Sequence, residues 1–338
     1  MATIQDVAKR AGVGAATVSR VLNGTGYASE QTREKVLRAA RELHYVPSGL
    51  GQQLLSRKTM TVGVVVTDMD NPFFSSFVEA LEGFLHERGY KTMLCCTKGQ
   101  REKEEGFLNF LSQSMVDGLI TTSHLLDASI YQSIERPIVS IDRVLSPTTP
   151  MVCADHISGG RLAAQVMIEA GCRQVVQLHD SEADILGGVT SMGVQDAVIA
   201  DYPFAARHRE FARCLQEAGI PCHSCYKEWN GFGAQRQQHW VEDLFQRWPD
   251  VDGIMTVDLL AVRCLRIAME RSKARPVPKI VAYDGTSLSE LCVPRLDAIV
   301  QPVEDMAREA VRLLMMEIRG ENIPERQVIL PVKLRRGD

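Results

Sequence analysis

In the first 45 residues, apolar side chains recur every three or four positions, in three short runs. This spacing places them on one face of a helix. Thr3 and Asp6 fit a capping box, in which a hydroxyl and an acid three residues later satisfy free N–H groups. Gly12 separates the first run from the second, and Pro47 disfavours helix just before it. The side chains predicted to face inward are Val7, Ala11, Val18, Val21, Leu22, Val36, Ala40 and Leu43.

The second of these predicted helices has an outer face of small or hydrogen-bonding side chains followed by one forked cation. These are Ala15, Ala16, Thr17, Ser19 and Arg20. Such a face is typical of a helix that enters a DNA major groove, about 12 Å wide, and donates to phosphates and base edges. The alternative is an ordinary helical hairpin in a small bundle. We interpret the two helices as a DNA-binding helix-turn-helix.

From Thr61 onward the pattern changes to short apolar runs rich in β-branched residues, alternating with segments of helical length. Near-continuous apolar runs between helices predict parallel strands covered on both faces. One series includes TVGVVVTD, DGLITTS and PIVSID, and a second begins near Gly160 and includes CRQVVQLHD, DGIMTVD and KIVAYDG. The chain is expected to cross back near Gln301, and QVILPVKL to supply a final strand. This two-lobed α/β body is similar to the periplasmic binding protein architecture.

The stretch DVAKRAGVGAATVSRVLN, then SEQTREKVLRAARELHY and VPSGLGQQLL, closely resembles the headpiece of the lactose/galactose repressor family. The resemblance continues more weakly to the C-terminus. It implies an all-α helix-turn-helix headpiece at 1–46, a hinge helix at 47–59 and an α/β effector-binding and dimerisation domain at 60–338. The N-lobe is expected at about 60–157 and 300–325, and the C-lobe at about 158–299 and 326–338.

The resemblance also implies which residues meet operator DNA. Leu54 matches a hinge leucine that inserts into the central minor-groove base step when two hinges pair. The insertion unstacks the bases at a cost in energy and bends the duplex, so that more of it contacts the protein. Ser48, Gly51 and Gln52 depart from the family pattern in this hinge. The predicted DNA-binding set is Thr3, Ala15, Ala16, Thr17, Ser19, Arg20, Asn23, Tyr27 and Leu54.

Ligands of such two-lobed bodies bind at the carboxyl ends of the strands. Residues that follow predicted strands, or that match family positions near the cleft, are therefore the effector-binding candidates. They are Asn71, Phe73, Phe74, Asp142, Arg207, Trp229, Asp258 and Asp284. Carboxylates can accept paired hydrogen bonds from sugar hydroxyls, whereas an aromatic ring can stack on a sugar or a base. A core position is the alternative for each phenylalanine. Glu210 replaces the usual family glycine near Arg207, and 181–205 is longer than the family norm.

Charge is distributed unevenly along the chain. The net charge is −4, but residues 1–59 contain nine Lys or Arg and four Asp or Glu, so this segment is +5 and the rest is −9. A basic N-terminal segment on an acidic body indicates that a polyanion binds at one end.

The nine cysteines are scattered along the chain, which argues against a disulfide framework. The sequence shows no apolar leader and no run of about 18 apolar residues that could span a membrane. We therefore expect a cytoplasmic, nucleoid-associated protein. Cys222 and Cys225 have the spacing of metal ligands, but no second pair follows at zinc-finger distance. We therefore predict no metal site and no cofactor.

The sequence contains no GxSxG elbow, Walker loop, HExxH or dinucleotide fingerprint. We therefore predict a transcription regulator rather than an enzyme. It is expected to be a homodimeric repressor of sugar-utilisation genes whose affinity for double-stranded operator DNA is set by a sugar or sugar phosphate. The alternative is a regulator that needs a purine corepressor or a phosphocarrier protein partner. A periplasmic solute-binding protein would not need the headpiece.

Overall fold

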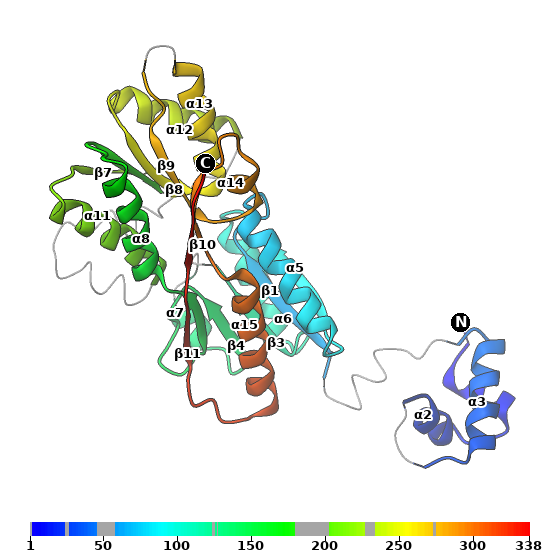
Figure 1. Cartoon of the computed structure of the whole chain (residues 1–338). Helices are drawn as coiled ribbons and strands as arrows, with labels where there is room; N and C mark the ends of the chain where they lie inside the picture. The colour runs from blue at the N-terminus through cyan, green and yellow to red at the C-terminus, as the bar shows by residue number, and fades with distance from the viewer. Residues whose placement is uncertain are drawn as a thin grey trace. The chain divides into compact units, whose positions relative to one another are not determined.

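The computed structural model describes residues 2–23, 27–45, 58–123, 126, 128–179, 203–226, 234–272 and 275–338 (Figure 1). The predicted hinge with Leu54, the ring of Trp229 and most of the long 181–205 segment lie outside the described residues. The chain divides into two compact units, Met1–Met60 and Thr61–Asp338.

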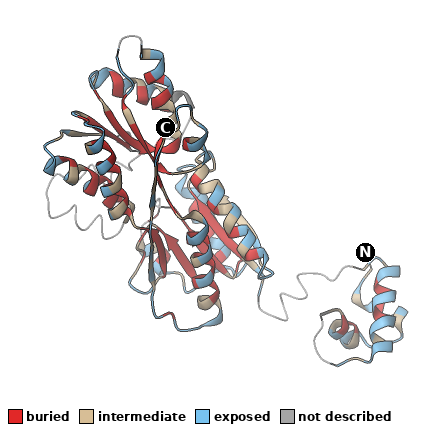
Figure 2. Ribbon diagram, viewed as in Figure 1, coloured by how far each residue is buried: buried red, intermediate tan, exposed pale blue. Residues whose placement is uncertain are grey.

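The described residues of the first unit form three helices, α1 (Ile4–Ala11), α2 (Ala15–Asn23) and α3 (Glu30–Glu42). The apolar runs that predict these helices form one core, in which Val7, Val18 and Val36 are fully buried (Figure 2). α1 ends at Gly12, whose φ of 67° is left-handed and suits glycine. The predicted three-helix headpiece is therefore present.

The predicted capping box at the start of α1 is also present. The Thr3 backbone N–H and hydroxyl both donate to Asp6 Oδ2 at 2.8 Å, and the Asp6 N–H donates to the Thr3 hydroxyl at 3.3 Å. These hydrogen bonds lower the pKa of Asp6. The cap fixes where α1 begins, and therefore how α1 packs against α2 and α3.

Replacing Thr3 with alanine should destabilise the headpiece by about 1 kcal/mol, because the Asp6 N–H loses its side-chain acceptor and the Asp6 carboxylate loses the hydroxyl donor. Hydrogen exchange of the α1 amides measures this loss in the intact chain. Thr3→Ser is the matched control, since it keeps the hydroxyl and should exchange like the wild type. Equal exchange in all three proteins would show that the cap does not stabilise α1.

The second unit contains two six-stranded sheets, each in its own lobe (Figure 1). The N-lobe sheet has the order β11-β5-β4-β3-β1-β2 and all its pairs are parallel. Its strands are β1 (Thr61–Val66), β2 (Lys91–Cys96), β3 (Gly118–Thr121), β4 (Ile138–Ile141), β5 (Met151–Ala154) and β11 (Gln327–Leu330). The continuous apolar run of β1 is buried on both faces, as a central parallel strand requires.

The C-lobe sheet has the order β12-β10-β9-β8-β6-β7, and among the described strands only the edge strand β12 is antiparallel to its neighbour. Its strands are β6 (Val175–His179), β7 (Cys222–Tyr226), β8 (Gly253–Val257), β9 (Lys279–Asp284), β10 (Asp297–Val300) and β12 (Lys333–Arg335). The predicted doubly covered parallel sheets are therefore confirmed.

Helices cover both faces of each sheet. In the N-lobe, α5 (Pro72–His86) and α15 (Val303–Arg319) pack together on one face, and α6 (Arg101–Ser112) and α7 (Ala128–Gln132) cover the other. In the C-lobe, α8 and α11 pack on one face and α12 and α13 on the other. The C-lobe helices are α8 (His156–Glu169), η1 (Pro203–Ala205), α11 (Ala206–Glu217), α12 (Ala234–Arg247), α13 (Asp258–Arg271) and α14 (Ser287–Leu291).

Among the elements that the structure describes, the chain crosses between the lobes three times: after β5, after β10 and after β11. The predicted crossing near Gln301 lies between β10 and α15. However, QVILPVKL is two strands rather than one, because β11 pairs with β5 in the N-lobe and β12 pairs with β10 in the C-lobe. Pro331, which has no N–H to donate to a ladder, lies between them. The expected C-lobe segment 326–338 is thus corrected, since 327–330 belongs to the N-lobe.

Candidate functional sites

The outer face of α2 is open to solvent in the first unit. Ala15, Ala16 and Arg20 are exposed, and Thr17 and Ser19 are half-buried. The intervening Val18 and Val21 are buried in the three-helix core, so the core fixes which face of α2 points outward. This arrangement presents one guanidinium beside two methyl groups, as the sequence predicts for a recognition helix.

Two further members of the predicted DNA-binding set lie around this helix. Asn23 is the last residue of α2, and Tyr27 is 92% exposed in the segment before α3. The Thr3 hydroxyl caps the N-terminus of α1 through its hydrogen bonds with Asp6. That these residues contact DNA remains a prediction.

In the body, two predicted effector carboxylates follow strands of different lobes. Asp142 comes directly after β4, and Asp284 is the last residue of β9. Their φ values are 52° and 123°, both in a region that non-glycine residues seldom occupy. Such backbone strain is concentrated at functional sites, where the surrounding structure maintains it. The neighbouring Gly285 also has a positive φ, of 69°, and an added Cβ there would lie 2.5 Å from the Cα of Val300.

Asp284 is almost fully buried, at 4% exposure, and it is held by the strand beside it. The Gln301 side-chain amide donates to Asp284 Oδ1 at 2.8 Å, and the Gln301 backbone N–H donates to the Asp284 carbonyl at 3.1 Å. Gln301 lies at the crossing from C-lobe to N-lobe. The position of this carboxylate is therefore tied to the connection between the lobes.

Arg207 lies near the start of α11 and is 8% exposed. Its guanidinium is stacked 4.5 Å from the centre of the Tyr283 ring, the residue before Asp284. Arg207 Nε donates to His208 Nε2 at 3.1 Å, and His208 Nδ1 lies 3.2 Å from Gln177 Oε1. The predicted arginine thus stacks on Tyr283, which was not predicted and which directly precedes the predicted Asp284 in β9.

A second residue that was not predicted, His156, connects Tyr283 to Asp142. His156 Nε2 lies 2.8 Å from Asp142 Oδ1, and His156 Nδ1 lies 3.2 Å from the Tyr283 hydroxyl. Asp142 is therefore engaged with a side chain of the protein, and its carboxylate is only 13% exposed. The available signal was ADHISGG, in which the histidine lies two residues after the end of β5 and three residues before a glycine pair.

The aromatic prediction after β1 is revised by the structure. Phe73 is 6% exposed and stacks with Phe77 in the N-lobe core, so it cannot form a binding surface. Phe74 is half-buried and packs edge-on against Phe73. Asn71 caps α5 by accepting a hydrogen bond from the Phe73 N–H at 3.0 Å. Phe73 is therefore removed from the candidate set, because burial of an aromatic ring in the core is favourable in itself.

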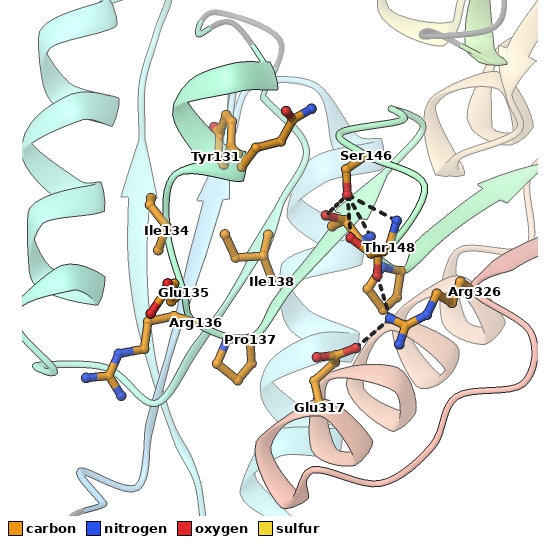
Figure 3. Close-up of a pocket in the computed structure, with 13 residues that line it drawn as sticks. Tyr131, Ile134, Glu135, Arg136, Pro137, Ile138, Ser146, Thr148, Glu317 and Arg326 are labelled. Atoms are coloured by element: carbon orange, nitrogen blue, oxygen red, sulfur yellow. Dashed lines mark hydrogen bonds and ion pairs between the residues drawn. The ribbon is translucent and has the colours of Figure 1, made fainter.

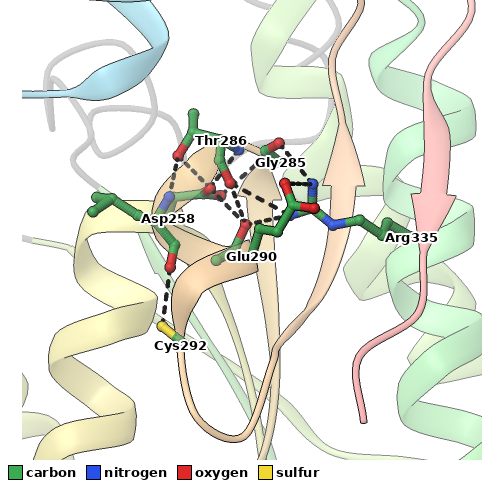
Figure 4. A network of polar contacts seen from close by, with 8 residues as sticks. Asp258, Gly285, Thr286, Glu290, Cys292 and Arg335 are labelled. Carbon is green, nitrogen blue, oxygen red and sulfur yellow. Dashed lines mark hydrogen bonds and ion pairs between the residues drawn. The ribbon is translucent and has the colours of Figure 1, made fainter.

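Asp258 is likewise placed differently from the prediction, because it is fully buried within the protein. It belongs to a network of polar contacts that includes Gly285 and Thr286 (Figure 4). Its carboxylate accepts hydrogen bonds from the Gly285 and Thr286 N–H groups and from the hydroxyls of Thr286 and Ser289. Burial raises the pKa of Asp258, and these donors oppose the shift. A carboxylate with four internal donors fixes the turn after Asp284, and we remove Asp258 from the effector-contacting set.

A polar hollow of about 570 Å³ lies in the N-lobe at the opposite end of the strands (Figure 3). Pro137 and Pro150, which precede β4 and β5, line it, and Arg326 pairs with Glu317 across it at 2.8 Å. None of the predicted effector residues line this hollow. Parallel α/β folds bind ligands at the carboxyl ends, so the hollow is not the effector site.

Cys222 and Cys225 do not form a chelating pair. Both belong to β7, where positions three apart point to opposite faces of the sheet. Accordingly, Cys222 packs against the α8 and α11 side and Cys225 against the α12 and α13 side. Within the described residues, no three His, Cys, Asp or Glu side chains are grouped as metal ligands, and no helix could cross a bilayer.

Comparison with known families matches both parts of the chain. Residues 3–48 match the family of bacterial regulatory proteins called the lacI family, and residues 164–338 match the periplasmic binding protein-like domain. A sucrose operon repressor from Pediococcus pentosaceus is 34% identical over 337 residues, covering 99% of this chain and 98% of that protein. The chain belongs to the lacI family. It is a DNA-binding transcription regulator with a helix-turn-helix headpiece and a two-lobed α/β body.

Another relative of this lacI-family protein is a ribose operon repressor from Halalkalibacterium halodurans. It is 32% identical over 336 residues, which cover 99% of this chain and 96% of the relative. Among solved structures, a transcriptional regulator CelR–cellobiose complex is 28% identical with a TM-score of 0.67, covering 100% of this chain and 99% of that one. The lac repressor dimer bound to operator has a TM-score of 0.81 at 23% identity, covering 99% and 98%, which supports the fold alone.

Glu210, which replaces the usual family glycine, forms an ion pair between α8 and α11 of this lacI-family protein. Glu210 accepts hydrogen bonds from Arg161 at 2.7 Å and from Arg213 at 2.8 and 3.0 Å. The hydrogen bonds from Arg213, followed by those from Arg161, lower the pKa of Glu210 to about 2. α8 and α11 approach closely here, since a Cβ on Gly160 would lie 2.4 Å from the Arg207 carbonyl.

The stabilisation from Glu210 should therefore depend on pH. Because the folded pKa of about 2 lies below the ordinary 4.5, folding favours the ionised form. The contribution is present above pH 4.5 and is lost as the pH falls toward 2. We expect Glu210→Gln to cost about 1 kcal/mol at pH 6, with a difference in thermal midpoint from wild type that vanishes at low pH. The control is Glu217→Gln, at an exposed ion pair, which should change the thermal midpoint little at any pH. If Glu210→Gln lowered the thermal midpoint by the same amount at every pH, the stabilisation would not come from the ionised Glu210 carboxylate.

Proposed function

We propose that this lacI-family protein is a homodimeric repressor of sugar-utilisation genes. In this proposal a sugar or sugar phosphate binds at the carboxyl ends of the two sheets and changes the affinity of the headpieces for operator DNA. The observation that carries the proposal is that the Arg207 guanidinium lies 4.5 Å from the centre of the Tyr283 ring, while the next residue, Asp284, ends β9 at the edge of the sheet where such bodies bind ligands.

The chemistry of these groups suits a polyhydroxylated ligand. A carboxylate accepts hydrogen bonds from hydroxyls, and a guanidinium donates to ring or phosphate oxygens. The relatives named as ribose and sucrose operon repressors, and the CelR–cellobiose complex, support a sugar as effector. The purine alternative rested partly on Phe73 as a stacking surface, and that ring lies in the core. We therefore favour the sugar.

Two copies are expected to act together on DNA. One recognition helix covers only a half-site, so a near-palindromic operator bound by a dimer is the simplest arrangement. The basic N-terminal segment supports steep salt dependence through phosphate contacts. Footprinting of an operator should therefore show two related half-sites, and an asymmetric half-site occupied by monomer would refute this part of the proposal.

A thermal-shift titration of the full chain tests the effector. The probes are D-ribose, sucrose and cellobiose, with hypoxanthine and guanine for the purine alternative. A ligand that binds only the folded protein at a hundred times its Kd stabilises it by about 2.7 kcal/mol, which is readily seen as a higher midpoint. A shift with a sugar and not with a purine supports the proposal, and the reverse pattern favours the corepressor alternative.

A further inference from the structure

The two lobes are joined by a continuous set of buried polar contacts at the carboxyl ends of their sheets. Asp142 follows β4 of the N-lobe, His156 begins α8 at the first crossing, and Tyr283 is in β9 of the C-lobe. His156 Nε2 is 2.8 Å from Asp142 Oδ1, and His156 Nδ1 is 3.2 Å from the Tyr283 hydroxyl. His156 and Tyr283 are 3% and 1% exposed. We call this set, Asp142, His156 and Tyr283, the interlobe relay.

The polar groups of the interlobe relay can be assigned as donors and acceptors. Burial raises the pKa of Tyr283, so the phenol keeps its proton and can donate. A carboxylate only accepts. The consistent arrangement has His156 Nε2–H donating to Asp142 while Nδ1 accepts from the Tyr283 hydroxyl. Both ring nitrogens are then satisfied, and the imidazole has one fixed orientation.

The surrounding backbone is adapted to this contact. Asp142 has a φ of 52°, a conformation that a non-glycine residue adopts only at some cost in energy. Gly159 lies one turn after His156, and an added Cβ there would be 2.1 Å from the Tyr283 hydroxyl. The absence of a side chain at 159 is therefore what allows Tyr283 to reach the histidine.

The far end of the relay meets the proposed effector groups. The Arg207 guanidinium is stacked 4.5 Å from the centre of the Tyr283 ring, and Asp284 follows Tyr283 in the chain. A cation stacked on a desolvated ring is attracted to the negative face of the ring. A shift of the Tyr283 ring must therefore change where Arg207 lies.

We propose that the interlobe relay positions Arg207, so that the arrangement of the lobes and the geometry of the effector site are coupled through His156. The coupling to effector rests on the function proposed above, but the positioning of Arg207 does not. Asp142 and Tyr283 are then positioning residues. Asp142, predicted as a sugar contact, acts through His156 instead.

The positioning of Arg207 is tested without any sugar, by hydrogen exchange of the backbone amides at 206–211 in α11. Tyr283→Phe removes only the hydroxyl, and Asp142→Gly removes the carboxylate acceptor while tolerating the φ of 52° at this position. Each should raise exchange at these amides about fivefold, equivalent to one lost hydrogen bond. In a His156→Leu background, Asp142→Gly should have no further effect, because the connection is already broken. An unchanged exchange rate in Asp142→Gly overturns the relay.

Tyr131→Phe is the matched control, because the Tyr131 hydroxyl is also buried and hydrogen-bonded to a carboxylate, that of Glu104. It should lower the thermal midpoint without altering exchange at 206–211. If all three variants raised exchange equally, the effect would be general loosening and the relay would be refuted. Should His156→Leu fail to fold, Gly159→Ala breaks the same contact by displacing the Tyr283 hydroxyl.

Calorimetry with D-ribose, sucrose and cellobiose then separates the two proposals. Tyr283→Phe and Asp142→Gly should each weaken binding of the recognised sugar about fivefold, and the double variant should be no weaker than the single ones. Effects that multiply in the double variant would indicate separate sugar contacts and overturn the relay. If no sugar binds the wild type, the proposed effector class fails, whereas the exchange experiment still decides whether the relay positions Arg207.

Discussion

Replacing Arg20 with alanine should weaken operator binding ten- to a hundredfold. Arg20 is the only cation among the exposed or half-buried predicted contacts of α2 within the described headpiece, and the core residues Val18 and Val21 hold this face outward. An arginine in a recognition helix contributes about 1–3 kcal/mol when it meets a base edge. Fluorescence titration of an operator duplex at fixed salt measures the loss, and the thermal midpoint of the body should stay unchanged.

The salt dependence of the same variant identifies the group that Arg20 contacts. If Arg20 meets a phosphate, the slope of log K against log salt should fall by about one and all sequences should lose affinity alike. If it meets a base edge, the slope should stay and discrimination at one position should relax. Arg308→Ala is the control for charge, since Arg308 pairs with Glu304 and Asp305 in the body. An operator affinity equal to wild type in Arg20→Ala would show that α2 is not the recognition helix.

The headpiece could be predicted closely because its determinants are local. The capping box at Thr3 and the left-handed glycine at 12 act within one turn of the helix, and the apolar spacing specifies the core directly. Each of these signals is complete in a few consecutive residues. The boundaries of α1 and the inward face of α2 therefore follow from the sequence alone.

The body could be predicted in its architecture but not in all its pairings. The strand MVCA was overlooked because it is only four residues long and follows SPTTP, a segment with turn character. QVILPVKL reads as one strand because its apolar pattern is continuous, whereas the pairing of its halves with β5 and β10 depends on residues more than 30 positions away. Local pattern cannot specify such distant partners.

In the candidate effector site, too, the positions of the residues could be predicted but their contacts could not. Strand-end positions were predictable from topology, which explains the placement of Asp142 and Asp284. What each carboxylate contacts was not predictable, since the donors of Asp258 come from the turn at 285–289 and the partner of Asp142 comes from α8. Tyr283 and His156 look like an ordinary core tyrosine and a helix-start histidine in the sequence. Their connection appears only when both sheets are in place.

Arg207→Gln and Asp284→Asn should each weaken effector binding ten- to a hundredfold while operator binding in the absence of effector is retained. Removing either charged group leaves polar groups of a bound ligand unpaired, at a cost of about 1–3 kcal/mol. Asp284→Asn should keep the hydrogen bond from Gln301, because the amide oxygen can still accept it. The expected proteins bind operator but no longer release it when sugar is added, since a ligand shifts an equilibrium only through its differential affinity.

Arg213→Gln is the matched control for Arg207→Gln, because it removes the same charge from the same helix. Arg213 is paired with Glu210 and Glu217 on the outer side of α11, so its loss should lower the thermal midpoint slightly and leave effector affinity within about twofold. Calorimetry with the recognised sugar and operator release in a fluorescence titration give the two readouts. Normal effector affinity in both Arg207→Gln and Asp284→Asn would place the effector elsewhere. If Arg207→Gln alone loses affinity, the guanidinium binds the ligand and Asp284 serves to hold the connection between the lobes through Gln301.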